Sequence, residues 1–209
     1  RCLSRGLGDV YKRQYSISAE VLPEIREYER TSTTTVNAYV KPVVSSYLAN
    51  LEAGLARAGV NADLLLMQSN GGLTPSETAK RLPMNIIESG PAGGVVGARF
   101  LADTSGLGDL ITFDMGGTTA KASMVENGQY ARADEFEVGG GILAGSRLLT
   151  GAGYKLKTQA IDLSEVGAGG GSLVWIDAGG ALQIGPESAG ASPGPVCYDA
   201  GGEAPTVTD

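Results

Sequence analysis

The chain has 209 residues, a formal net charge of −7 at pH 7 and no histidine. This length can bury a full core, whereas the acidic balance argues against a nucleic-acid partner, and no apolar run is long enough for a transmembrane helix. The lack of histidine excludes Ser-His-Asp and Cys-His catalysis and histidine-bound zinc, so any metal must bind oxygen ligands, as Mg²⁺ does. Only Cys2 and Cys197 are present, too few for a disulfide scaffold, and we expect a reducing, cytoplasmic location.

The amino-terminal part predicts a leader followed by a long helix. Residues 1–14 show no clear periodicity and no signal peptide, so we expect them to lie outside the native fold, the alternative being a flexible basic arm. Residues 33–58 carry apolar side chains at spacings of three and four, which predicts a helix whose stripe, tyrosines included, faces the core. Pro42 is expected to kink this helix or mark its first turn, and Gly59 to end it.

The next segment alternates short strands and helices, an order typical of an α/β domain. A strand is expected over 63–68, followed by a turn at Asn70, Gly71 and Gly72. A helix over 74–81 would have Thr74 as its N-cap and Pro75 as its first residue. A further strand is expected over 85–87 and a helix over 90–101.

Residues 110–128 carry the strongest local pattern of the chain. An apolar run ends in Asp114, the turn Gly116-Gly117-Thr118-Thr119 follows, and a second alternating run leads to Asn127-Gly128. Asn-Gly between such runs is a strong hairpin signal, because both turn residues need positive φ. The pattern predicts strand, glycine turn, strand, tight turn, strand.

This glycine hairpin has two interpretations. In the first, Asp114 holds a hydrated divalent cation, the turn lines a phosphate with N–H groups and hydroxyls, and Lys121 projects toward the same pocket. In the second, it is a β-meander with a glycine-rich turn. A Walker A loop and a dinucleotide-binding G-x-G-x-x-G motif are both missing from the sequence.

The carboxyl-terminal part is rich in glycine from 139 to 171, with one short helix candidate at 146–149. Strands are expected over 173–176 and 181–184 and from 207 onward, and the prolines of 192–195 predict a rigid loop. This region is interpreted either as a lid or substrate pocket or as a loop-rich surface layer.

Six blocks of the chain together resemble the hydantoinase/oxoprolinase family, which contains N-methylhydantoinase, 5-oxoprolinase and ketone carboxylase subunits. The blocks are REYERTSTTTVNAY, MQSNGGL, ESGPAGGVVGA, TFDMGGTTAKA, VGAGGGSLVWID and GPESAGASPGPVCY. The resemblance covers about 15–209 and implies an α/β fold of the actin, sugar-kinase and heat-shock-chaperone type, a ribonuclease H-like mixed sheet with flanking helices. It implies an incomplete domain: a helix and strand portion (15–105), a phosphate-hairpin lobe (106–138) and a glycine-rich β and loop portion (139–209).

The resemblance also implies roles for individual residues. TFDMGGTTAKA matches the second phosphate hairpin of the family, so Asp114 would hold Mg²⁺ through water. Gly116, Gly117, Thr118 and Thr119 would bind ATP phosphate, with Lys121 as a charge partner. Two further loops could line the substrate cleft. The first consists of Asn70, Gly71 and Gly72, and the second of Gly169, Gly170, Gly171 and Ser172. For the second loop, a close-packed structural turn is an equal alternative.

Two positions depart from the family pattern. Many relatives have an aspartate at the position of Lys121, and a lysine suits a phosphate but cannot ligate a cation. Relatives often place a histidine just before the GAGGGS block, where this chain has Ser164-Glu165, so a histidine-dependent metal site is not supported. The first phosphate hairpin and the adenosine motif of the family would lie outside this chain.

The implied activity is an ATP-dependent hydrolase that phosphorylates and opens a hydantoin-like or oxoproline-like cyclic amide. The alternatives are a subunit of an ATP-dependent ketone carboxylase and a lobe that is non-catalytic when isolated. The resemblance further implies a second large subunit of hydantoinase B type and a homo-oligomer, with no nucleic acid and no membrane as partners.

Overall fold

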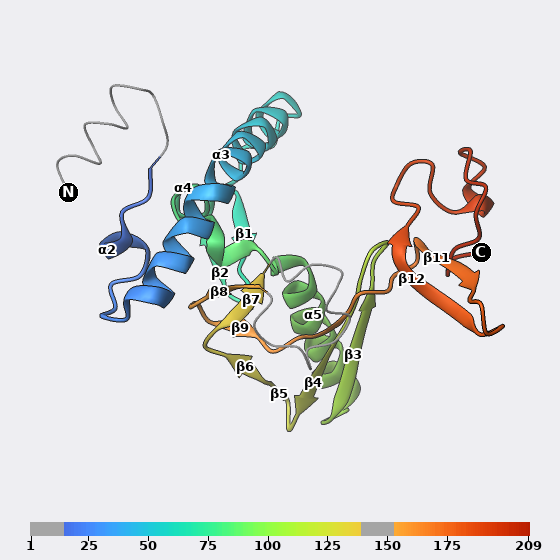
Figure 1. The fold of residues 1–209 in the computed structure, drawn as a ribbon. Coiled ribbons are helices and arrows are strands. Elements are labelled where there is room, and N and C mark those ends of the chain that lie inside the picture. The colour runs from blue at the N-terminus through green and yellow to red at the C-terminus, as the bar shows by residue number, and fades with distance from the viewer. Residues whose placement is uncertain (1–14, 139–152) are drawn as a thin grey trace. The chain divides into compact units, whose positions relative to one another are not determined.

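The computed structural model describes residues 15–138 and 153–209 (Figure 1). These residues divide into two compact units. The first unit consists of the described residues up to Val96 together with Arg132–Val138 and Tyr154–Ile161. The second is built mainly from Gly97–Ala131 and Asp162–Asp209. The predicted leader at 1–14 and the helix candidate at 146–149 lie outside the described residues.

The first unit combines helices with three short antiparallel strand pairs, β1 with β2, β6 with β9 and β7 with β8. Helix α5, Ser89–Ser105, begins in this unit and ends in the second. The other elements of the unit are α2 (Ser18–Val21), α3 (Glu27–Arg57), β1 (Leu65–Met67), β2 (Leu73–Pro75), α4 (Ser76–Arg81), the 3₁₀ helix η1 (Pro83–Ile86), β6 (Arg132–Ala133), β7 (Phe136–Val138), β8 (Tyr154–Leu156) and β9 (Ala160–Ile161).

Helix α3 is the predicted long helix, but only part of its apolar stripe is buried. It ends where Gly59 takes a φ of +78°, as expected. Thr33, Asn37 and Leu48 recur on one helical face and are fully buried, because α2, α4, η1 and β8 pack against the helix. Tyr39 is 83% exposed. The expectation that the whole stripe faces the core is therefore wrong, since the stripe is wider than the face that the neighbouring elements cover.

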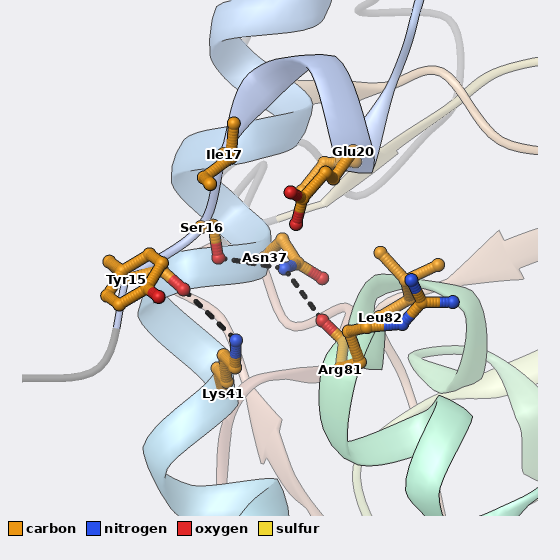
Figure 2. A pocket seen from close by; sticks show the side chains of 9 residues that line it. Tyr15, Ser16, Ile17, Glu20, Asn37, Lys41, Arg81 and Leu82 are labelled. Atoms are coloured by element: carbon orange, nitrogen blue, oxygen red, sulfur yellow. Dashed lines mark hydrogen bonds between the residues drawn. The ribbon is translucent and has the colours of Figure 1, made fainter. Parts of the chain in front are cut away.

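A buried asparagine joins three segments of the first unit. Nδ2 of Asn37 donates to Oγ of Ser16 at 2.9 Å and to the carbonyl of Arg81 at 3.3 Å (Figure 2). Nearby, Nζ of Lys41 donates to the carbonyl of Tyr15 at 3.0 Å. These residues line a cavity of about 350 Å³. A buried amide is favourable only when it is hydrogen-bonded, so Asn37 fixes how the chain before α2 and the end of α4 meet α3.

Two local predictions in this unit are wrong. Residues 73–75 pair with β1, so Thr74 is a buried strand residue and Pro75, not Thr74, precedes α4 as its N-cap. Residues 85–87 do not form a strand. Asn85 instead donates its N–H to the carbonyl of Leu82 at 3.2 Å, an i to i−3 bond typical of the 3₁₀ turn that Pro83 opens.

The second unit contains a small antiparallel sheet in the order β10-β4-β3, with β5 paired to β4, and a separate β11–β12 hairpin. The strands predicted over 173–176 and 181–184 are present, whereas the strand expected from 207 is reduced to one bridge between Leu173 and Thr206. The elements are β3 (Leu110–Met115), β4 (Ala120–Glu126), β5 (Gln129–Tyr130), β10 (Ser164–Val166), β11 (Ser172–Ile176), β12 (Leu182–Ser188) and the 3₁₀ helix η2 (Val196–Tyr198).

Burial on α3 predicts a contrast between two substitutions. Leu48→Ala should lower the free energy of unfolding by about 2–5 kcal/mol, because it empties a fully buried site. Val43→Ala, at a side chain that is 73% exposed, should change it by no more than about 0.5 kcal/mol. Urea denaturation of both variants measures the difference, and equal effects would contradict the packing described for α3.

Candidate functional site

The predicted strand-turn-strand-turn-strand pattern is present. Strand β3 pairs with β4 over its whole length, from Leu110 opposite Val125 to Met115 opposite Ala120. The glycine turn is closed by a hydrogen bond from the N–H of Gly116 to the carbonyl of Thr119 at 3.0 Å. Asn127 and Gly128 have φ of 51° and 68°, the positive values that the second turn requires.

A row of charged residues crosses the sheet next to this turn. Asp114 on β3 lies directly opposite Lys121 on β4, and Lys121 lies directly opposite Glu165 on β10. Directly opposed residues share one face of a sheet. Nζ of Lys121 is 3.9 Å from Oε1 of Glu165, and the lysine side chain is only 15% exposed, whereas Asp114 is exposed. The lysine therefore stands between two carboxylates, and Glu165 joins the candidate site residues.

Sequence reasoning missed Glu165 as a member of this row. Its partner Lys121 lies far away along the chain, and only the pairing of β10 with β4 brings the two residues together.

The Gly169-Gly170-Gly171 run packs directly against the glycine turn of the hairpin. The N–H of Gly170 donates to the carbonyl of Gly116 at 2.9 Å, and the N–H of Gly171 donates to the carbonyl of Gly117 at 2.7 Å. Of the two interpretations of this run, the geometry matches the close-packed turn. A substrate-binding role for residues 169–172 stays a prediction.

The carboxyl-terminal residues hold this glycine run from its other side. The carbonyl of Gly170 accepts hydrogen bonds from the N–H and the hydroxyl of Thr208 at 3.0 and 2.8 Å. Oγ of Ser172 accepts the N–H of Gly169 at 2.9 Å. Ser172 is thus a buried structural residue of the turn, 2% exposed.

Asp209 anchors the same segment through its side-chain carboxylate. The N–H groups of Cys197, Thr206 and Val196 donate to it at 2.8, 2.8 and 3.2 Å. These bonds, that from Cys197 first, stabilise the charged form and hold the pKa of Asp209 well below its usual range. The same carboxylate raises the pKa of the Cys197 thiol, which donates a hydrogen bond to it.

A cavity of about 460 Å³ adjoins the hairpin turn. It is lined by two threonines of the turn, by one glycine and by a segment of β12 that includes one glutamate. The lining residues are Thr118, Thr119, Gly167, Pro186, Glu187 and Ser188. Glu187 was not among the residues that the sequence singled out, because a single glutamate in a strand carries no motif.

The predicted turn at 70–72 has the expected geometry but belongs to the first unit. Gly71 has a φ of +82°, and the N–H of Gly72 donates to Oδ1 of Asn70 at 2.8 Å. The hairpin belongs to the second unit, so a cleft shared by these two turns stays a prediction.

The side chains of the candidate site could hold Mg²⁺ only together with ligands from outside the chain. Within residues 15–138 and 153–209, no group of three or more acidic or cysteine side chains could hold a metal ion. Mg²⁺ is commonly bound through one or two carboxylates together with water and substrate phosphates, and the exposed Asp114 beside the glycine turn is one such carboxylate. No helix in the described part of the chain has the length and apolar character to cross a membrane.

The hairpin, the glycine run and the proline loop lie within a segment that matches one protein-family model. The model is described as Hydantoinase/oxoprolinase, and it matches residues 30–209. The chain belongs to the hydantoinase/oxoprolinase family. Among its relatives, an uncharacterised protein of Methanocaldococcus jannaschii is 50% identical over 92% of this chain and 28% of its own length. Caprolactamase subunit alpha of Pseudomonas jessenii is 40% identical over 91% of this chain and 25% of its own length.

Solved structures confirm the expected α/β fold class of this family member. The nucleotide-free structure of an acetone carboxylase matches 90% of this chain and 25% of its own with a TM-score of 0.73 and 28% identity. The crystal structure of the ATP-dependent caprolactamase from Pseudomonas jessenii matches 91% of this chain and 26% of the caprolactamase chain, with a TM-score of 0.64 and 40% identity. The chain therefore spans about a quarter of the length of these proteins.

The Asp209 anchor predicts a pH-dependent stability of the second unit. Because the folded-state pKa is lowered, its stabilisation is present above the ordinary aspartate pKa of about 4 and is lost as the pH falls below it. Asp209→Asn should lower the Tm at pH 7, and the difference from wild type should shrink toward pH 2. Fluorescence of Trp175, the one tryptophan of the chain, reports this melt from β11.

The matched control for this experiment is Asp134→Asn, which alters an exposed aspartate of the first unit. It should leave the Tm unchanged across the same pH range. A constant Tm difference between wild type and Asp209→Asn from pH 7 to pH 2 would contradict the anchoring role of the charged carboxylate.

Proposed function

We propose that this chain is the phosphate-binding part of an ATP-dependent hydrolase that opens a cyclic amide. The observation that carries the proposal is the glycine hairpin, with an exposed carboxylate near the end of β3 and a turn whose two threonines line a cavity. Membership of the hydantoinase/oxoprolinase family supports it. So does the likeness to a caprolactamase described as ATP-dependent.

ATP would drive the reaction by phosphorylating the amide oxygen. This phosphorylation would activate the amide carbon toward attack by water. The chain's own contribution would be positioning and charge. Turn N–H groups and the hydroxyls of Thr118 and Thr119 would hold phosphate oxygens, and Asp114 would orient the water shell of Mg²⁺. Lys121 would add positive charge beside the phosphates, moderated by its neighbour Glu165.

The relatives favour a hydrolase over a carboxylase by sequence. The caprolactamase is 40% identical and acts, by its name, on caprolactam, which is a cyclic amide, whereas the acetone carboxylase is 28% identical. The acetone carboxylase structure is nevertheless the better geometric match, with a TM-score of 0.73 against 0.64. A ketone carboxylase subunit is therefore the second candidate, and bicarbonate-dependent ATP use by the whole enzyme would select it.

A partner subunit is also part of this proposal. The caprolactamase relative is named as a subunit alpha, so we infer that the parent protein of this chain acts with a second large subunit. A homo-oligomer and a cytoplasmic location stay predictions from the sequence.

Substitution of Asp114 tests the proposed role of the hairpin. Asp114→Asn, in the full-length enzyme that contains this chain, should abolish ATP turnover, because the neutral amide cannot hold the hydrated cation. The Tm should change little, since Asp114 is exposed. Asp134→Asn, at another exposed aspartate, is the control and should keep wild-type turnover. Wild-type turnover in Asp114→Asn would contradict the role assigned to Asp114.

The isolated chain should bind nucleotide only weakly and hydrolyse neither ATP nor hydantoins. A single set of phosphate contacts open to water lacks both the positioning and the low dielectric that phosphoryl transfer needs. Calorimetry with Mg-ATP and a phosphate-release assay with and without hydantoin measure this. Micromolar affinity, or hydantoin-stimulated phosphate release above a protein-free control, would prove the prediction wrong.

A further inference from the structure

We propose that Gly169-Gly170-Gly171, here called the glycine clamp, orients two peptide groups of the hairpin turn so that their N–H groups can bind a phosphate. The inference rests on the proposed function, because the phosphate is taken to be that of a nucleotide. It assigns to the clamp a positioning role for the hairpin.

The orientation follows from the geometry of the peptide bond. The carbonyl of Gly116 and the N–H of Gly117 belong to one peptide group, and in a trans peptide they point in opposite directions. The clamp N–H groups bind the carbonyls of Gly116 and Gly117 at 2.9 and 2.7 Å. The N–H groups of Gly117 and Thr118 must therefore point away from the clamp, and neither donates in the backbone–backbone hydrogen bonds found among residues 15–138 and 153–209.

Two successive N–H groups that point to the same side form a concave anion site. Thr118 and Thr119, which carry hydroxyls, line the adjoining cavity of about 460 Å³. A phosphoryl group has the negative charge and the several acceptor oxygens that such an arrangement of donors recognises. The two N–H groups are available for it only because the opposite ends of their peptides are already bonded.

The clamp needs glycine for steric reasons. A Cβ at position 169 would lie 2.7 Å from the carbonyl oxygen of Gly116 and 2.7 Å from backbone atoms of Thr118. A Cβ at position 171 would lie 2.9 Å from the carbonyl oxygen of Gly117. Side chains at these positions would push on the turn backbone itself, so the hydrogen bonds that orient its peptides would lengthen or break.

The clamp is also supported from behind by Thr208. Its hydroxyl and N–H donate to the carbonyl of Gly170 at 2.8 and 3.0 Å. Loss of the hydroxyl alone leaves the N–H bond in place, so a valine at this position loosens the clamp without adding volume. This substitution separates a positioning role from a gross packing defect.

The test is isothermal titration calorimetry with Mg-ATP on the full-length enzyme that contains this chain. Gly169→Ala should raise the Kd roughly tenfold or more, the loss expected for one phosphate hydrogen bond from the turn. Thr208→Val should raise it about threefold, and Thr208→Ser, which keeps the hydroxyl, should restore it. Gly108→Ala is the control, because a Cβ at that exposed glycine meets nothing within 4 Å. Its Kd should equal that of wild type.

Stoichiometry and amide exchange distinguish the outcomes. Partial unfolding lowers the binding stoichiometry and leaves the Kd unchanged. An unchanged Kd in both Gly169→Ala and Thr208→Val would therefore overturn the positioning role of the clamp, while the proposed function would stand. If the wild-type enzyme does not bind Mg-ATP, the clamp proposal and the proposed function are both overturned. If Gly169→Ala does not fold, Thr208→Val and hydrogen exchange of the wild type decide. Amides of Gly117 and Thr118 should gain protection on Mg-ATP binding, and no gain overturns the proposal.

Discussion

Two backbone hydrogen bonds between a glycine run and a hairpin turn set the structure of the second unit's site. They join Gly170 to Gly116 and Gly171 to Gly117. Backbone can approach backbone this closely only where no Cβ intervenes, so glycine is required on the clamp. The glycine-rich character of this part of the chain is thus explained at these positions by contact between two loops and not by flexibility.

Support for this contact extends to the end of the described chain. Asp209 fixes Thr206 and the start of η2 through its carboxylate, and Thr208 lies between them and the clamp. The proline loop, the last residues and the glycine clamp therefore form one connected network of hydrogen bonds around the hairpin turn. A substitution far along the sequence from Gly116 can act on the turn through this network.

The first unit depends on a different constraint, the satisfaction of a buried amide. Asn37 occupies a core position of α3, and Ser16 and the end of α4 satisfy its hydrogen bonds there (Figure 2). Among the residues that line the nearby cavity, Lys41 is already bonded to a backbone carbonyl. The proposed phosphate site is therefore at the hairpin and not at this cavity.

The sequence by itself determined the features that depend on neighbouring residues. The hairpin from Leu110 to Gly128 and the end of α3 at Gly59 follow from local turn chemistry, in which particular residues tolerate positive φ. The family was also recognisable from motif order. Only tertiary structure decided which face of α3 is buried, that Thr74 joins a strand, that Glu165 stands beside Lys121, and that the glycine clamp packs on the turn. Each of these depends on contact between residues distant in sequence, and hydrophobic periodicity and turn propensity carry no information about such partners.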